Sequence, residues 1–341
     1  MKQISALALL ATLGAAAHAQ SNVTLFGIVD VGVRHVKNGD GSVTSLSSNG
    51  VNTSRLGVRG IEDLGDGLKA GFWLETGLNP DTGTTSDSTR LWNRRATVSL
   101  IGRFGELRLG RDFTPTYTGF SDFDAFGTNG VASSDKFTSR FGTTADTITR
   151  ADNEASYFLP ENLGGVYGQV SAAAGEGVSG KKYGGGRIGY ATGPLNVSLS
   201  YGQTDVTPNA AGDDKFKFGS LGAAYDFRVV KLTGYVSEMK YGNQKLDVAN
   251  IGALVPLGQG TVRIGYIKAE FKGPGIDNNE ADQIALGYVY DLSKRTAVYA
   301  SAARVNNKGN ATFVVDGNPA LPSPNPARDS TGYEVGVRHR F

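Results

Sequence analysis

The chain has 341 residues, no cysteine and a formal net charge of +2. The lack of cysteine excludes a disulfide framework, a thiolate metal site and a cysteine nucleophile, and the small net charge gives no indication of nucleic-acid binding. Glycine supplies 48 residues, about twice its average usage. After the N-terminal segment, no stretch approaches the roughly 18 apolar residues that a membrane-spanning helix needs.

The first residues have the pattern of an export signal. Lys2 supplies a positive charge, residues 4–13 are apolar, and Ala17-His18-Ala19 is a cleavage site of the A-x-A type. The apolar stretch is shorter than the about 20 residues that cross a bilayer as a helix. We therefore expect residues 1–19 to be a cleaved signal peptide and residues 20–341 to form a single exported domain.

From the first mature residues onward, apolar and polar side chains alternate with a period of two, as in strands that have two different faces. The alternation begins with Val23, Leu25, Val29, Val31 and Val33 on one face, and it recurs at 53–59, 68–75, 95–100, 284–290 and 332–341. The second face carries Arg, Lys, Glu, Gly and Ser, which are poor choices for a packed interior. One face is thus expected to meet lipid and the other water; a secreted β-solenoid or β-sandwich also alternates and remains the structural alternative.

The connections between these segments alternate in length. Seven short turns lie at 63–67, 102–105, 162–165, 192–194, 226–228, 256–260 and 291–295. Eight longer polar stretches lie near 37–50, 79–89, 114–151, 175–182, 205–214, 241–246, 272–280 and 306–329. This pattern predicts an all-β fold: a 16-stranded antiparallel transmembrane β-barrel with short periplasmic turns and long external loops.

Aromatic residues near the short turns are typical of the girdle that a membrane barrel forms at the lipid–water interface. The expected members are Tyr157, Phe158, Tyr190, Tyr225, Phe227, Tyr288, Tyr290 and Phe341.

Several segments along the whole mature chain resemble the general porins of β-proteobacteria. They are the N-terminal Ser21-Asn22-Val23-Thr24-Leu25-Phe26-Gly27, residues 53–70, residues 94–100 with 105–111, residues 286–296 and the closing Gly336-Val337-Arg338-His339-Arg340-Phe341. The resemblance implies a 16-stranded barrel that forms a homotrimer, with the third external loop folded inward. It also implies that the C-terminal aromatic residue, here Phe341, is an assembly signal read by the barrel-assembly machinery.

The third long connection, 114–151, is the largest, and connections this long are usually functional. Its phenylalanines favour a position inside the lumen, where the rings are buried and Asp122 and Asp124 face the water path; an external loop packed on its neighbours is the alternative. We expect 114–151 to be an inward-folded constriction loop.

Arginines mark the other side of the expected constriction. Alternation places Arg55, Arg59 and Arg95 on the polar face, and Arg150 follows the long loop. The family resemblance points to Arg55, Arg95 and Arg150 as a cluster that lines the constriction, with Arg94 in place of Arg95 if the register slips by one. A wall ion pair with Glu62, Asp63 or Glu75 is the alternative role for each arginine.

The expected function is that of a general diffusion porin in the cell outer membrane, through which small hydrophilic solutes and ions pass. Because arginines arranged around a narrow pore favour anions, a mild to moderate anion preference is expected. The expected partners are the other subunits of a homotrimer, outer-membrane lipid and lipopolysaccharide, the assembly machinery and the permeating ions. No cofactor, metal or nucleic acid is expected.

Two other functions compete with a pore. An adhesin or binding barrel would present its long loops to a partner. A barrel-type hydrolase needs acid–base residues, but the chain has three histidines, of which His18 leaves with the leader and His35 and His339 fall near opposite strand ends. The chain is therefore not expected to be an enzyme.

Overall fold

The computed structural model describes residues 22–210, 212–315 and 327–341. The expected signal peptide, residues 1–19, and Gln20 lie outside the described residues, as does part of the last long connection. Among the described residues, no helix is long and apolar enough to cross a membrane.

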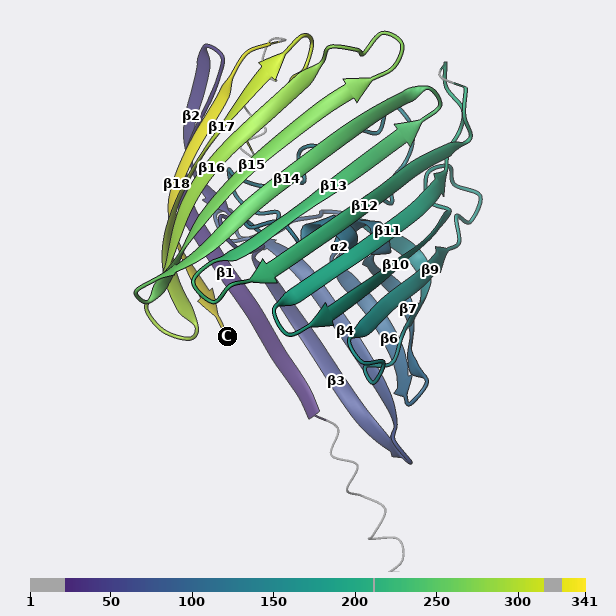
Figure 1. The fold of residues 1–341 in the computed structure, drawn as a ribbon. Coiled ribbons are helices and arrows are strands. Elements are labelled where there is room, and N and C mark those ends of the chain that lie inside the picture. Colours follow the sequence, from purple (N-terminus) through teal and green to yellow (C-terminus); the bar gives the residue numbers. More distant parts are fainter. Residues whose placement is uncertain (1–21, 211, 316–326) are drawn as a thin grey trace, which may run out of the picture.

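The strands form one closed antiparallel sheet in which sequence neighbours pair (Figure 1). The strands are β1 (Asn22–Asn38), β2 (Gly41–Ser48), β3 (Arg55–Gly65), β4 (Leu68–Asn79), β5 (Thr84–Thr85), β6 (Arg95–Gly102), β7 (Gly105–Phe113), β8 (Arg150–Phe158), β9 (Val166–Ala173), β10 (Tyr183–Thr192), β11 (Leu195–Asp205), β12 (Lys215–Asp226), β13 (Lys231–Tyr241), β14 (Gln244–Leu257), β15 (Gly260–Lys272), β16 (Glu280–Asp291), β17 (Thr296–Lys308) and β18 (Ser330–Arg340). The ring closes where β1 pairs with β18, from Ile28 opposite Arg340 to Asn38 opposite Ser330.

The wall has sixteen strands when β2 and β3 are counted as one and the short β5 is left out, which confirms the predicted barrel. The upper half of β1 pairs with β2 and its lower half pairs with β3, so β2 and β3 form one wall strand with a break at 49–54. The two-residue β5 pairs only with the end of β4. Within the break, the buried Asp30 carboxylate accepts hydrogen bonds from the backbone amides of Gly50, Val51 and Asn52 at 2.7–3.1 Å. These bonds satisfy amides that the broken strand leaves without sheet partners.

The seven short turns lie where the sequence predicts them, but two of the eight expected long loops are wrong. Instead of a loop at 37–50, β1 and β2 continue as a hairpin around Gly39 and Asp40. Instead of a loop at 241–246, Gly242 and Asn243 join β13 to β14. Gly39 and Gly242 both have a φ of +55°, which glycine adopts readily. Polar strand ends that extend beyond the membrane have the composition of loops, and this explains the error.

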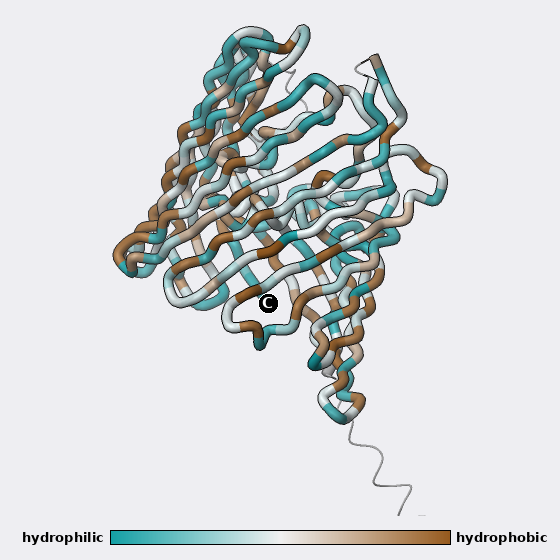
Figure 2. The backbone as a smooth tube through the Cα atoms, turned by 45° about the vertical axis from the view of Figure 1, so that its right-hand side comes forward, coloured by the Kyte–Doolittle hydropathy of each residue, from teal (hydrophilic) through white to brown (hydrophobic). Residues whose placement is uncertain are grey.

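The barrel wall has the reverse of the usual polarity of a globular protein. Leu25 is 62% exposed on the outer face of β1, whereas Asp30 on its inner face is fully buried. Apolar side chains alternate in this way on strand after strand, including Val98, Leu199 and Ile284. Figure 2 shows the resulting alternation of hydrophobic and hydrophilic positions along the wall, with hydrophilic residues dominating the long-loop end. An outer face of this kind is suited to hydrocarbon.

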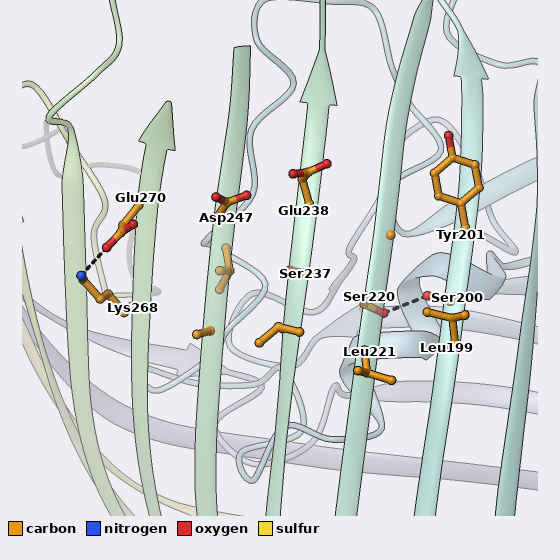
Figure 3. A pocket seen from close by; sticks show the side chains of 14 residues that line it. Leu199, Ser200, Tyr201, Ser220, Leu221, Ser237, Glu238, Asp247, Lys268 and Glu270 are labelled. Carbon is orange, nitrogen blue, oxygen red and sulfur yellow. Dashed lines mark hydrogen bonds and ion pairs between the residues drawn. The ribbon is translucent and has the colours of Figure 1, made fainter. Parts of the chain in front are cut away.

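The outer wall also shows where the apolar zone ends. On neighbouring strands, Leu199 and Leu221 lie lower, whereas Glu238, Asp247 and Glu270 lie nearer the long-loop end (Figure 3). The charged positions form ion pairs between and along strands, including Lys272 to Asp247 at 2.7 Å and Lys245 to Glu238 at 3.0 Å. Charged pairs above an apolar band mark the polar boundary of a membrane-spanning wall.

Most of the expected aromatic girdle lies on the outer face next to the short turns. The Tyr157 hydroxyl donates to the carbonyl of Phe104 at 2.5 Å, and that of Tyr288 donates to the carbonyl of Leu257 at 3.0 Å. Phe158 differs from the prediction: it faces the lumen, where the Arg108 guanidinium carbon lies 4.1 Å from its ring centroid. The alternation explains this, because adjacent residues of a strand point to opposite faces.

Candidate functional site

The segment 114–151 begins with a short helix against the inner wall. Helix α2 (Pro115–Ser121) has proline in its first turn and is capped by Thr114, whose hydroxyl accepts a hydrogen bond from the Tyr117 amide at 3.3 Å. The helix packs on β10, β11 and β12 (Figure 1). At Gly119 a Cβ atom would lie 2.1 Å from the Ser200 hydroxyl, so glycine permits this close approach to the wall.

Aromatic rings hold the segment in this position. Phe120, Phe123 and Phe126 are almost completely buried, and the Phe120 ring lies 5.3 Å from that of Tyr235 on the inner face of β13. Burial raises the pKa of the Tyr117 hydroxyl in α2. These rings bury apolar area between the segment and the wall, which stabilises the inward position.

The middle of the segment is fixed on the opposite side of the lumen. The Gly130 amide donates to the carbonyl of Asn49 in the β2–β3 break at 3.0 Å. The Val131 amide donates to the carboxylate of Glu334 on β18 at 3.2 Å, and Glu334 forms a buried ion pair with Arg34 of β1 at 2.7 Å. The segment therefore spans from β10–β12 to the seam where the barrel closes.

Six arginines form a continuous group on the inner wall of β3–β8, which we call the arginine cluster: Arg55, Arg59, Arg94, Arg95, Arg108 and Arg150. They come from adjacent strands whose alternation turns these positions inward.

Three carboxylates form ion pairs with four of these six guanidinium groups. Glu75 pairs with Arg94 at 2.6 Å and with Arg55 at 3.4 Å. Asp112 pairs with Arg108 at 2.7 Å and with Arg95 at 3.4 Å. Glu106 pairs with Arg108 at 2.8 Å. The cluster thus carries more positive than negative charge.

Two members of the cluster make no ion pair within the described residues. The guanidinium of Arg150 donates from Nε to the Arg94 carbonyl at 2.8 Å and lies 4.0 Å from the ring centroid of Phe113. The guanidinium of Arg59 lies 5.0 Å from the ring of Trp73, and that of Arg95 lies 4.6 Å from the same ring. Contact with aromatic faces holds all three cations in place and leaves the charges of Arg59 and Arg150 without a carboxylate among the described residues.

A hollow of about 690 Å³ opens beside the cluster, and Arg59, Lys69, Trp73, Arg95 and Arg108 are among its lining residues. Planar guanidinium groups present several N–H donors in a fixed geometry, which suits carboxylates and phosphates. The site therefore provides positive charge and hydrogen-bond donors to a passing anion. It provides few unpaired carboxylates to a cation.

The expected site residues divide into two groups. Arg55, Arg59, Arg95 and Arg150 lie in one cluster, whereas Asp122 and Asp124 are not partners of it. Asp122 pairs with Arg187 of β10 at 2.6 Å. Asp124 accepts hydrogen bonds from the amides of Phe126 and Thr128 and from the Ser134 hydroxyl, so both its oxygens serve the fold of its own segment.

Sequence reasoning missed several members of the site. Arg108 follows Glu106 on the inner face of β7 and lies opposite Ser99 in the register, so the same alternation rule could have found it. Arg94 and Arg95, considered as alternatives, both belong to the cluster because Arg94 precedes β6 and is turned toward Glu75. Of the carboxylates considered as wall partners, Glu75 pairs with Arg55, while Glu62 and Asp63 form no ion pair with described residues.

The sequence matches the profile of the family described as Gram-negative porin over residues 6–310. The chain therefore belongs to the Gram-negative porin family, whose members are outer-membrane channels and not enzymes. Localisation to the outer membrane agrees with the apolar outer face of the barrel.

Individual relatives agree with this assignment along the whole chain. The chain is 41% identical to outer membrane porin protein 32 of Delftia acidovorans, over 100% of this chain and 99% of that protein. It is 32% identical to an outer membrane porin protein of Bordetella pertussis, with both chains fully covered. Among solved structures, the anion-selective porin from Comamonas acidovorans superposes with a TM-score of 0.87 at 38% identity, covering 94% of this chain and 100% of that one.

Proposed function

We propose that this diffusion porin prefers small hydrophilic anions to cations and that the arginine cluster is the element that selects them. The observation that carries the proposal is a group of six arginines in which three carboxylates pair with only four, so that Arg59 and Arg150 have no ion pair within the described residues. Fixed charge in a narrow pore with low-dielectric walls sets up a strong local potential, and arginine favours anions. A similar solved structure is named as an anion-selective porin, which supports the same preference here.

We further propose that the segment 114–151 narrows the water path opposite this cluster. Support comes from its attachment at two places on the inner wall, through α2 and through Gly130 and Val131. Narrowing brings permeating ions within a few ångströms of the cluster, where screening by water and salt is weakest.

The test is the zero-current potential of single channels between unequal potassium chloride solutions. The sign expected for the native protein is that of chloride permeating faster than potassium. In Arg59→Gln, which removes a cation that has no carboxylate partner in the described part of the chain, the permeability ratio of chloride to potassium falls about two- to threefold because the local potential drops. The matched control, Arg103→Gln, removes an arginine from an exposed short turn and leaves the ratio within experimental error. Potassium preference in the native protein would overturn the proposal.

Trimer formation belongs to the same proposal. The outer face carries exposed apolar residues on β1 and β6, among them Leu25 and Val98, that need cover from lipid or from another subunit. We expect the purified protein in mild detergent to have the mass of three chains, and a monomeric mass contradicts this.

Lipopolysaccharide is the proposed lipid partner at the long-loop end. A groove of about 670 Å³ on the outer wall combines Leu199, Leu221 and Val236 with Lys268 and three carboxylates, one of which, Glu270, pairs with Lys268 (Figure 3). Apolar side chains suit acyl chains, and lysine suits phosphate. We expect lipopolysaccharide to co-purify with the native protein and less of it with Lys268→Gln. Its absence from the native protein, or equal amounts with both proteins, contradicts binding in this groove.

We also propose that Phe341 is read by the barrel-assembly machinery and that the leader is cleaved before Gln20. In support, Phe341 remains 46% exposed while its backbone exchanges hydrogen bonds with Gly27 at the seam. Phe341→Ser is expected to lower the yield of folded protein in the outer membrane while refolding from denaturant is retained; equal yields in cells contradict the proposal. The mass of the mature protein tests the cleavage site.

A further inference from the structure

A second group of cations lies on the inner wall near the short turns, outside the arginine cluster. It surrounds a hollow of about 300 Å³ lined by Arg228, Lys231, Arg263 and Arg338, together with Asp226 and Asp291. We call it the lower basic pocket. Both carboxylates are engaged: Asp291 pairs with Arg338 at 3.2 Å, and Asp226 accepts the Arg228 amide at 2.7 Å.

Two guanidinium groups in this pocket have a donor with no partner among the described residues. The side chain of Arg338 is only 6% exposed, and its Nε is buried without a hydrogen-bond acceptor. The Nε of Arg263 is likewise buried without an acceptor, and Arg263 makes no ion pair within the described residues. A buried donor on a charged group is costly when it lacks an acceptor, so an acceptor oxygen that reached these groups would be favourably bound.

The sheet explains how these long side chains share the pocket. Asp291, Ala297 and Arg338 are consecutive partners across β16, β17 and β18. Because the intervening residue is a fully buried alanine, Arg338 can reach across β17 to Asp291. Arg263 lies opposite Gly287 on β16, which leaves room above the neighbouring strand.

The lower basic pocket is connected electrostatically to the arginine cluster. Arg263 has Asp124, Arg338, Asp291 and Arg340 as charged neighbours, and Arg340 is in turn a charged neighbour of Arg55. Arg340 donates to the side-chain oxygen of Asn52 at 3.2 Å, which fixes it between the two groups. Guanidinium groups therefore extend from the cluster toward the short-turn end, with the carboxylates of Asp124 and Asp291 among them.

We infer that the lower basic pocket is a second anion-binding site of the pore, suited to small dianions with phosphate or carboxylate oxygens. This inference rests on the proposed anion preference and extends it to a defined site. Two guanidinium groups that line one hollow, each with several N–H donors, match a compact group with several acceptor oxygens better than a monatomic ion. The volume of the hollow is sufficient for a single group of this size.

The experiment measures how inorganic phosphate, added to both sides at pH 7.5, reduces the chloride current through single channels. In the native protein the reduction is reversible and saturates with phosphate concentration. Arg263→Gln raises the half-blocking concentration about tenfold, because one charge-assisted contact is lost. Arg263 is the appropriate position since its replacement leaves no carboxylate without a partner.

The matched control is Arg295→Gln, which removes an exposed arginine from a neighbouring short turn that does not line the pocket. Its half-blocking concentration stays within about twofold of the native value, as expected for an exposed charge. Lys231→Gln, at the exposed rim of the pocket, raises it about threefold by the loss of one partly screened charge and decides the question if Arg263→Gln forms no channels.

Equal half-blocking concentrations in the pocket variants and in Arg295→Gln overturn the site, and so does a native chloride current that phosphate leaves unchanged. The zero-current potential distinguishes a failure of the proposed site from a failure of the proposed anion preference. Chloride preference with block insensitive to the pocket variants retains the anion-preferring pore and rejects the site. Potassium preference together with a phosphate block that depends on Arg263 retains the site and rejects the anion-preferring pore.

Discussion

At the scale of single residues, the balance of charge in the arginine cluster depends on Glu75. Its carboxylate pairs with Arg55 and Arg94 and also accepts a hydrogen bond from the Trp73 indole at 3.1 Å. Its side chain is only 8% exposed. Glu75 therefore both fixes the arginines and reduces their net charge, and its removal should separate these two effects.

Glu75→Gln is expected to increase the preference for chloride and to destabilise the barrel. The loss of charged hydrogen bonds to two arginines costs about 2 kcal/mol of the free energy of unfolding, while the permeability ratio of chloride to potassium rises about twofold. Denaturant unfolding followed by tryptophan fluorescence measures the first effect, and the zero-current potential measures the second. Glu62→Gln, at an exposed position without an ion pair in the described chain, should change neither. An unchanged ratio in Glu75→Gln speaks against the cluster as selector.

Alternation along strands accounts for the residues that sequence could identify. Arg55, Arg59 and Arg95 lie within alternating segments, so their common face follows from the period of two. Arg94 precedes its strand, where this rule does not apply. The role of Asp124 depends on hydrogen bonds within its own segment, and no pattern of spacing reports such bonds.

At the scale of elements, the segment 114–151 is stabilised by close packing against glycine. A Cβ atom at Gly222 of β12 would lie 2.1 Å from the Phe123 ring, which is completely buried. The phenylalanines of the segment were visible in the sequence. The glycines that receive them were not recognisable as such, because the register that brings β12 to the segment is a tertiary property.

Gly222→Ala is expected to displace Phe123 and with it the segment from the inner wall. Overpacking of this kind costs about 1–3 kcal/mol, so the single-channel conductance should change and fluctuate between levels. Gly219→Ala, on the same strand, is the matched control because its Cβ would meet its nearest atoms at 3.4 Å, an ordinary contact. Identical steady conductance in both variants would show that the segment does not depend on this contact.

Elements at the long-loop end were the least predictable. The chain at 37–50 and at 241–246 is rich in polar residues, yet both segments are hairpins whose strands continue past the apolar band. The composition of a segment reflects whether water or lipid surrounds it, so strands that are surrounded by water have the same composition as loops. Hydrogen bonding to a neighbouring strand decides between the two structures.

At the scale of the whole molecule, the fold was predictable because every strand has the same relation to lipid and water. A soluble protein needs an apolar core, whereas this chain exposes residues such as Leu25 and buries residues such as Asp30. Closure of the sheet between β1 and β18 satisfies the backbone groups that an open edge would leave without partners in the membrane. The number of strands was predicted by counting the connections, because short turns at one end of the barrel alternate with longer connections at the other.

The most direct test of this arrangement uses the absence of cysteine from the native chain. Thr24 lines the hollow beside Arg59, whereas its neighbour Leu25 is exposed on the outer face. Each is replaced by cysteine and treated, as single channels, with a charged thiol reagent that does not enter lipid. We expect a stepwise change of current in Thr24→Cys and none in Leu25→Cys. A change in Leu25→Cys alone would show that the alternate residues of the wall do not face the water path in this way.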